Sequence, residues 1–186
     1  NFQNLYQFSS TTGQKPTKIL LVGDTIFGLT TQGGNYNFGT IYKMKVDGTN
    51  FSVLHHFGSI PNDVGGGKSN IIYYNGVLYG SSYYGGSIWD VFGNFKCGYI
   101  YKLNSNGSNY SFVHEFDSNN SANPHECIVL TNNKLYGRYD ITAGNLPNKI
   151  YFYNVLSNNY ACPIGTFTFA NTGIRGITAN QTNVYC

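Results

Sequence analysis

The chain has 186 residues, of which 41% are hydrophobic, so it can form one domain with a core and is too apolar for general disorder. Charged residues make up only 10%, against roughly 25% in an ordinary soluble protein. The net charge is +3, and the Lys and Arg residues are spread along the sequence without forming a cluster. This distribution argues against a nucleic-acid-binding protein. No apolar run approaches the roughly 18 residues of a membrane helix, so we expect no membrane span.

The chain opens with an isolated alternating segment, Phe2–Phe8, that matches the later segment Phe51–Phe57. Alternation of ring and polar side chains is typical of a half-buried strand. If the strands of a repeating unit are named a, b, c and d, residues 1–10 are expected to hold a lone d strand.

A strand–turn–strand pattern then recurs four times at intervals of about 50 residues, with its second strand ending near Gly28, Gly80, Gly137 and Cys186. Asn75-Gly76 is its strongest turn signal, because a two-residue type I′ turn needs positive φ at both positions. We interpret each copy as the a and b strands of one unit.

A second hairpin follows in each of the first three units. It spans Gly39–Phe57 and Gly98–Phe116, and a weaker copy runs from Lys149 to Phe167. Four short strands that repeat at this period predict an all-β β-propeller with four-stranded blades. The whole chain, 1–186, is then a single domain with blades at 17–58, 69–117 and 126–169 and a partial blade at 173–186.

The last unit lacks a c strand. If the N-terminal d strand completes it, the propeller closes with four blades. The missing c strand still leaves three alternatives: the chain continues past Cys186, a neighbouring molecule supplies the strand, or the gap stays open. An unpaired strand edge recruits partners, so intermolecular pairing is a serious hypothesis. The residues expected at such a junction between subunits are Phe2, Leu5, Phe8, Val184 and Cys186.

The pattern of Leu-Tyr-Gly, a Gly-Gly loop, Gly-x-Ile-Tyr-Lys-Leu, Asn/Asp-Gly and Val-Leu-His-x-Phe resembles the tandem β-propeller repeat of predicted secreted proteins of environmental bacteria. The similarity covers nearly the whole chain and is weakest in the third unit, where Ile150–Tyr153 lacks the lysine. The resemblance implies a propeller and an extracellular setting, and it transfers no catalytic residues.

Four cysteines, Cys97, Cys127, Cys162 and Cys186, have no spacing that makes a zinc site. Disulfides are the favoured reading, with buried thiols as the alternative. Because a and c strands start on the same face of a propeller, Cys97 and Cys127 are the preferred pair and Cys162 and Cys186 the remaining one. An intermolecular bridge through Cys186 stays open.

Most aromatic residues alternate along strands and are expected to fill the space between blades. The loop between the b and c strands of the second unit differs, since it is long and holds the only Trp. Such a loop is either folded over its own blade or a contact surface for glycans or proteins. The candidate contact residues are Tyr83, Tyr84, Trp89 and Phe92, with Tyr36 in the shorter loop of the first unit.

Signals of catalysis are weak. His55 and His114 occupy equivalent positions where the N-terminal segment has Tyr6, which favours a packing role. The eight carboxylates are scattered, and no hydrolase, zinc-protease or P-loop motif is present. We therefore expect no enzyme activity, no catalytic residue, no metal and no cofactor.

Two functions remain. The first is a secreted or cell-surface structural and adhesive protein that assembles with copies of itself into a polymer or filament. The second is a monomeric glycan-binding propeller that uses the Trp89 loop. A particle of high order without ligand indicates the first, and a monomer whose Trp89 fluorescence responds to sugars indicates the second.

Overall fold

The computed structural model describes residues 3–64, 70–89, 93, 96–117, 122–140, 149–161, 178–179 and 184–185, and the regular structure in these residues is all β. No helix in this part of the chain could cross a membrane. The strands of the first two units are β1 (Gln14–Val22), β2 (Thr25–Gln32), β3 (Thr40–Lys45), β4 (Ser52–His56), β5 (Ile71–Tyr74), β6 (Val77–Ser82), β7 (Tyr99–Asn104) and β8 (Ser111–Glu115). Those that follow are β9 (Ala122–Thr131), β10 (Lys134–Asp140), β11 (Lys149–Asn154), β12 (Asn159–Ala161), β13 (Thr178–Ala179) and β14 (Val184–Tyr185).

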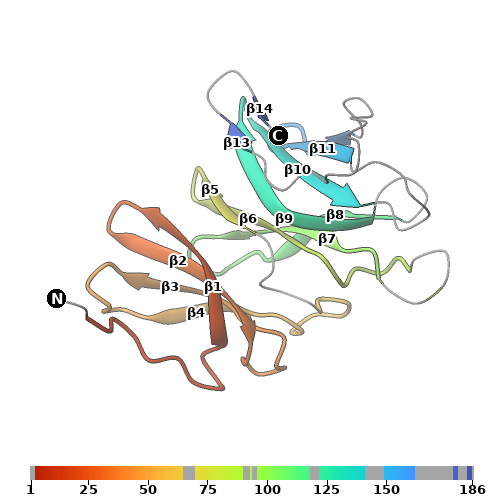
Figure 1. Cartoon of the computed structure of the whole chain (residues 1–186). Coiled ribbons are helices and arrows are strands. Elements are labelled where there is room, and N and C mark those ends of the chain that lie inside the picture. The colour runs from red at the N-terminus through yellow and green to blue at the C-terminus, as the bar shows by residue number, and fades with distance from the viewer. Residues whose placement is uncertain are drawn as a thin grey trace.

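These strands form three four-stranded antiparallel sheets, each in sequence order, and one two-stranded pair. We call β1–β4 blade 1, β5–β8 blade 2 and β9–β12 blade 3. Figure 1 shows the blades following one another, with the N-terminus beside blade 1 and the β13–β14 pair beside blade 3. The all-β class and the repeated four-stranded units are confirmed.

The tight turns follow from their residues. In the β5–β6 turn, Asn75 and Gly76 have φ of 47° and 82°, as a type I′ turn requires. In the β9–β10 turn, Asn132 and Asn133 have φ of 47° and 58°. Asn tolerates this region because its short polar side chain bonds locally. The local sequence therefore sets the register of both hairpins.

A glycine in the second strand of each blade makes room for a ring. A Cβ on this glycine would lie 2.2–2.3 Å from a tyrosine side chain of the neighbouring strand, a distance that real Cβ atoms do not reach. The tyrosine is fully buried in each blade. The pairs are Gly28 with Tyr42, Gly80 with Tyr101 and Gly137 with Tyr151.

Successive blades join through a repeated cluster of four rings. The end of one blade supplies a histidine and a phenylalanine, and the next blade supplies two tyrosines. The histidine stacks on one tyrosine with ring centroids 3.5 Å apart at both junctions, and the phenylalanine meets the other tyrosine edge-on at 5.7 and 5.1 Å. The clusters are His55, Phe57, Tyr101 and Tyr110 between blades 1 and 2, and His114, Phe116, Tyr151 and Tyr160 between blades 2 and 3.

The N-terminal segment repeats this ring geometry without forming a strand. Residues 3–9 have no strand assignment, so the lone d strand expected there is not present as a hydrogen-bonded element, and Phe2 lies outside the described residues. Tyr6 nevertheless stacks on Phe51 at 3.7 Å, and Phe8 meets Tyr42 edge-on at 5.0 Å. The segment packs on blade 1 as a d strand would. It lacks ladder hydrogen bonds because no described c strand lies beside it.

The apolar core lies between the blades as two clusters, one at each junction. Cys97 is buried in the cluster between blades 2 and 3. The side chain of Cys127, together with Cys162 and Cys186, lies outside the described residues, so the disulfide pairing stays a prediction.

Candidate functional site

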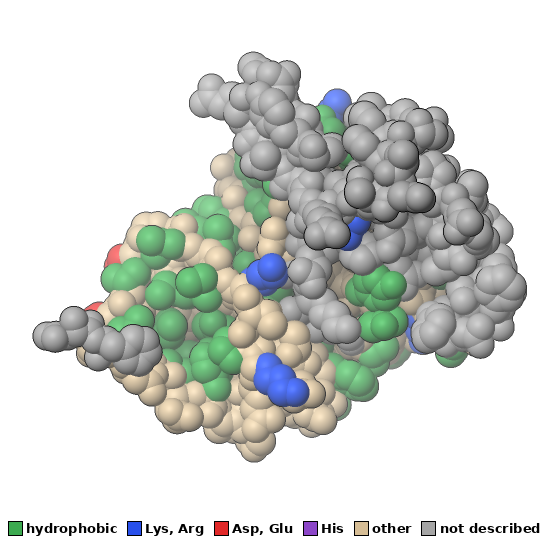
Figure 2. Space-filling view, in the orientation of Figure 1, with side chains coloured by type: hydrophobic (Ala, Val, Ile, Leu, Met, Phe, Trp, Pro, Cys, Tyr) green, Lys and Arg blue, Asp and Glu red, His purple; other side chains and the backbone are tan. Residues whose placement is uncertain are grey.

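Blade 1 exposes an apolar sheet face that the other blades bury. Ile19 and Leu21 on β1 are 73% and 62% exposed. Ile71 and Ile128 pair with Gly80 and Gly137 as Ile19 pairs with Gly28, yet they are only 5% and 3% exposed. The difference arises because blades 2 and 3 each lie against a preceding blade. Figure 2 shows hydrophobic side chains gathered over blade 1.

The N-terminal segment borders this open face of blade 1. The carbonyl oxygen of Leu5 would lie 2.3 Å from a Cβ on Gly48. At the next junction, the carbonyl oxygen of Leu54 would lie 2.9 Å from a Cβ on Gly107. Glycine at this turn therefore admits the backbone of the segment packed against it. Leu5 is partly exposed and Phe8 packs inward, which places these predicted junction residues at the edge of the open face.

The other predicted junction residues lie elsewhere. Val184 pairs with Ala179 in the β13–β14 hairpin, which packs against β9 of blade 3. The two chain ends lie far apart in Figure 1, so one copy of the chain does not bring Val184 beside Leu5 and Phe8. Phe2 and Cys186 lie outside the described residues.

The aromatic loops lie together at one end of blades 1 and 2. Trp89 and Tyr36 are 54% and 50% exposed, and Phe92 lies outside the described residues. Tyr83 and Tyr84 meet edge-on at 4.7 Å and are only partly exposed. The described sequence-predicted residues therefore divide into two exposed rings and a half-buried pair.

The loop between β4 and β5 joins the two aromatic loops. A Cβ on its Gly58 would touch Tyr36, and its Asn62 carbonyl accepts a hydrogen bond of 2.9 Å from the Gly86 amide. The ammonium of Lys96 bonds to the Asn62 side chain and lies 5.3 Å from the centre of the Trp89 ring. These contacts hold Trp89 at the surface by a cation–π interaction and a backbone brace.

A buried carboxylate ties the same loop to blade 2. Asp63 is fully buried, and its Oδ2 lies 2.7 Å from Nε2 of His55 and accepts a 3.1 Å bond from the Gly58 amide. Its Oδ1 accepts the hydroxyls of Tyr99 and Tyr110 at 2.6 and 2.7 Å. Burial raises the pKa of both tyrosines well above the usual value, so they remain donors.

The histidine at the junction between blades 2 and 3 lies in a different environment. Nε2 of His114 is buried with no hydrogen-bond partner among the described residues. Burial lowers the pKa of His114 to about 4, although Asp117 and Glu115 oppose the shift. His114 is therefore neutral at pH 7 and serves as a stacking ring on Tyr160.

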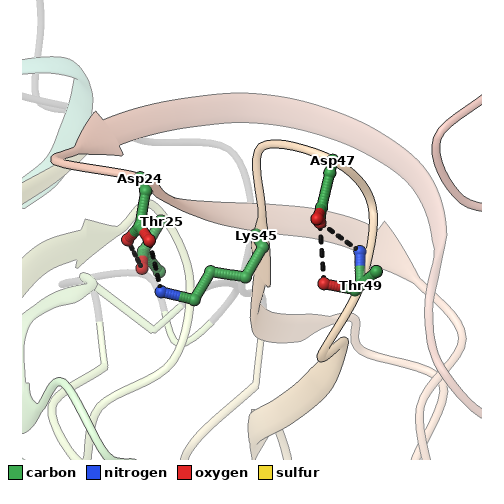
Figure 3. Close-up of polar contacts among 5 residues, drawn as sticks. All are labelled: Asp24, Thr25, Lys45, Asp47 and Thr49. Carbon is green, nitrogen blue, oxygen red and sulfur yellow. Dashed lines mark hydrogen bonds and ion pairs between the residues drawn. The ribbon is translucent and has the colours of Figure 1, made fainter.

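A groove of about 460 Å³ opens between blades 1 and 2 at the end opposite the aromatic loops. Its wall includes Lys45, which donates a 2.7 Å bond to Asp24, as Figure 3 shows. Asp47, in the adjacent turn, accepts two bonds from Thr49 (Figure 3). The lining residues are Val22, Thr25, Phe27, Lys43, Met44, Lys45, Asn50, Tyr73 and Ser105.

The described residues offer no clear site for acid–base or metal chemistry. Within the described ranges, no group of three or more His, Cys, Asp or Glu could hold a metal ion. The buried pair of His55 and Asp63 is almost closed to solvent, and the carboxylate accepts all its bonds from the protein. Such a pair stabilises the junction between blades.

Sequence reasoning missed Asp63 and the groove. Asp63 lies in a loop with no periodic pattern, and only its position eight residues after His55 connects the two. The groove depends on the side chains of two blades that face each other, which a single repeat does not reveal.

The fold and its junctions define a repeat protein of the β-propeller type. The sequence model of the Gloeobacter/Verrucomicrobia repeat matches residues 1–168. The chain therefore belongs to the Gloeobacter/Verrucomicrobia repeat family. No curated protein matches it.

Solved structures that resemble the chain are β-propellers. One, from a nidogen/laminin complex, has a TM-score of 0.59 and 19% identity over 91% of this chain and 54% of its own. Another, the GH43 BlXynB protein of Bacillus licheniformis, has a TM-score of 0.53 and 16% identity over 91% of this chain and 34% of its own. The chain thus spans about half or a third of these structures. At such identity the likeness establishes the fold alone.

Proposed function

We propose that the chain is a non-enzymatic structural and adhesive protein of the cell exterior, in which blade 1 of one copy takes up the C-terminal hairpin of another copy. The open face of blade 1 carries this proposal. It exposes Ile19 and Leu21, whereas blades 2 and 3 bury Ile71 and Ile128 at the position of Ile19. Burial of such a side chain contributes roughly 1.5–3 kcal/mol.

The position of the N-terminal segment indicates that the open face of blade 1 is suited to bind another blade. Its rings pack on Phe51 and Tyr42 with the geometry found at both junctions between blades, so the segment lies where the fourth strand of an incoming blade would lie. The β13–β14 hairpin packs against blade 3, at the far end of the same chain. A second copy can therefore present its hairpin to this face. Contact between unlike ends continues into a ring or a filament.

An extracellular setting agrees with the composition. Only 10% of the residues are charged, and Asn, Ser, Thr, Gly and Tyr supply much of the polar surface. The GH43 neighbours share the fold at low identity, and catalysis forms no part of this proposal.

The test is the mass of the protein by light scattering over a range of concentrations. We expect the wild type to exceed the single-chain mass of 20.6 kDa as concentration rises. The double variant Ile19→Glu and Leu21→Glu should remain a monomer. Leu156→Glu is the matched control, since Leu156 is exposed on a turn of blade 3 away from the open face. A wild type that stays monomeric throughout, or an equal loss in the control, would overturn the proposal.

A second candidate function is glycan binding at the aromatic loops. It is supported by the exposed ring of Trp89, held by Lys96, and by exposed Tyr36 at the same end of the blades. Trp89 is the only Trp, so its fluorescence reports on this surface directly. Saturable quenching by an oligosaccharide that is lost in Tyr36→Ala would support this function, and an unchanged spectrum across a panel of glycans would contradict it.

A further inference from the structure

The two junctions between blades differ at the end where their tight turns lie, and the difference creates the groove. Both junctions use equivalent positions, which the hairpin registers define. Between blades 2 and 3 these positions carry larger or more apolar side chains than between blades 1 and 2. The replacements are Tyr74 for Val22, Val77 for Thr25 and Val155 for Ser105.

These larger side chains fill the second junction. Val155 is buried, and Tyr74 and Val77 pack against the core cluster. The hydroxyl of Tyr74 donates a 2.5 Å bond across the junction to Asn133 of blade 3. Ser105 and Val155 are equivalent because each amide donates to a carbonyl of the adjacent hairpin turn, at 2.8 and 2.9 Å. The repeat can therefore close this space, and blades 1 and 2 leave it open.

The open groove combines a cation with hydroxyl groups and rings. Lys43 lines it and forms no ion pair with any residue that the structure describes, whereas Lys45 is paired with Asp24. Thr25 and Ser105 supply hydroxyls. The wall also contains Phe27 and Tyr73, whose rings lie 6.2 Å apart and nearly parallel. Lys43 is partly exposed, so its ammonium can reach a ligand in the groove.

We propose that this groove binds a small anionic saccharide, namely a sugar ring that carries a carboxylate. The ammonium of Lys43 would pair with the carboxylate, since charge-assisted hydrogen bonds are the strongest of their kind. The hydroxyls and the Asn50 amide would bond to the sugar hydroxyls, and the rings would contact its apolar face. The volume of about 460 Å³ falls in the range of roughly 300–1,000 Å³ for ligand pockets. The site is separate from both the open face and the aromatic loops.

Calorimetric titration with D-glucuronate and with neutral D-glucose tests the proposal. We expect glucuronate to bind wild-type protein at least about tenfold more tightly than glucose, because a bond to a charged group is worth at least that factor. Lys43→Gln should lose about tenfold in glucuronate affinity. Lys102→Gln is the matched control, since Lys102 occupies the same strand position in blade 2 and does not line the groove.

A filled variant tests the site itself. Val22→Tyr combined with Thr25→Val introduces the residues of the closed junction, so the protein should unfold at an unchanged or higher temperature and no longer bind glucuronate. Its mass by light scattering should equal that of the wild type, which separates this site from the proposed assembly. Absence of glucuronate binding to the wild type, equal binding by the filled variant, or an equal effect of Lys102→Gln would overturn the proposal.

Discussion

The junction between blades 1 and 2 and that between blades 2 and 3 share their rings and differ in their polar groups. Both stack a histidine on a tyrosine at 3.5 Å. At the first junction, Asp63 bonds to the histidine and to two tyrosine hydroxyls. At the second, Nε2 of His114 has no partner within the described part of the chain. The ring packing is therefore common to both junctions, and the hydrogen bonds to the Asp63 carboxylate belong to the first.

The largest effect is expected from Asp63→Ala. It would leave His55, Tyr99 and Tyr110 buried without their common acceptor, at a cost of about 3–5 kcal/mol, as for one partner removed from a buried charged cluster. Denaturant unfolding measures the loss. Asp47→Asn is the control, because Asp47 is exposed and blade 2 has Asn106 in the same turn; its midpoint should stay near that of the wild type. A loss below about 1 kcal/mol for Asp63→Ala would show that the network does not stabilise the junction.

The shared ring slot should respond equally at both junctions. Gly80→Ala and Gly137→Ala would drive a methyl group into the buried rings of Tyr101 and Tyr151, and we expect each to cost about 3 kcal/mol, the upper part of the range for overpacking. Gly76→Ala is the comparison: nothing lies near its Cβ, so only the strain of positive φ, about 1 kcal/mol, remains. Urea midpoints rank the three variants. Equal losses for Gly76→Ala and Gly80→Ala would contradict the role of the slot.

The elements that sequence reasoning found are those fixed by local chemistry. The Asn75-Gly76 turn and the alternation of rings along strands predicted the hairpins, since both depend on residues close in the chain. The match of the N-terminal segment to Phe51–Phe57 predicted its ring packing correctly. The strand predicted there is not formed, because a strand needs a neighbouring strand for its hydrogen bonds. Asp63 and the groove escaped notice because each depends on side chains from two different blades.

The smallest effect is the pH dependence that His114 contributes. Burial lowers the pKa of His114 to about 4 in the folded protein, against about 6.5 in the unfolded chain. The unfolded chain then binds more protons between these values, so His114 lowers stability as pH falls from about 6.5 to about 4 and has no effect above that window. Since the side chain is not fully buried, the loss should be about 2 kcal/mol after allowance for screening.

His114→Tyr isolates this contribution, because the N-terminal segment has Tyr6 at the same position in its own stack, so the ring contact with Tyr160 should survive. The difference in unfolding free energy between wild type and variant, measured from pH 7 to pH 4, should change by about 2 kcal/mol in favour of the variant. Burial also lowers the pKa of His56, although less than that of His114, so His56→Gln should change the pH dependence in the same direction by a smaller amount. A difference that stays constant with pH would contradict this prediction, because it would mean that the pKa of His114 is the same in the folded and the unfolded protein.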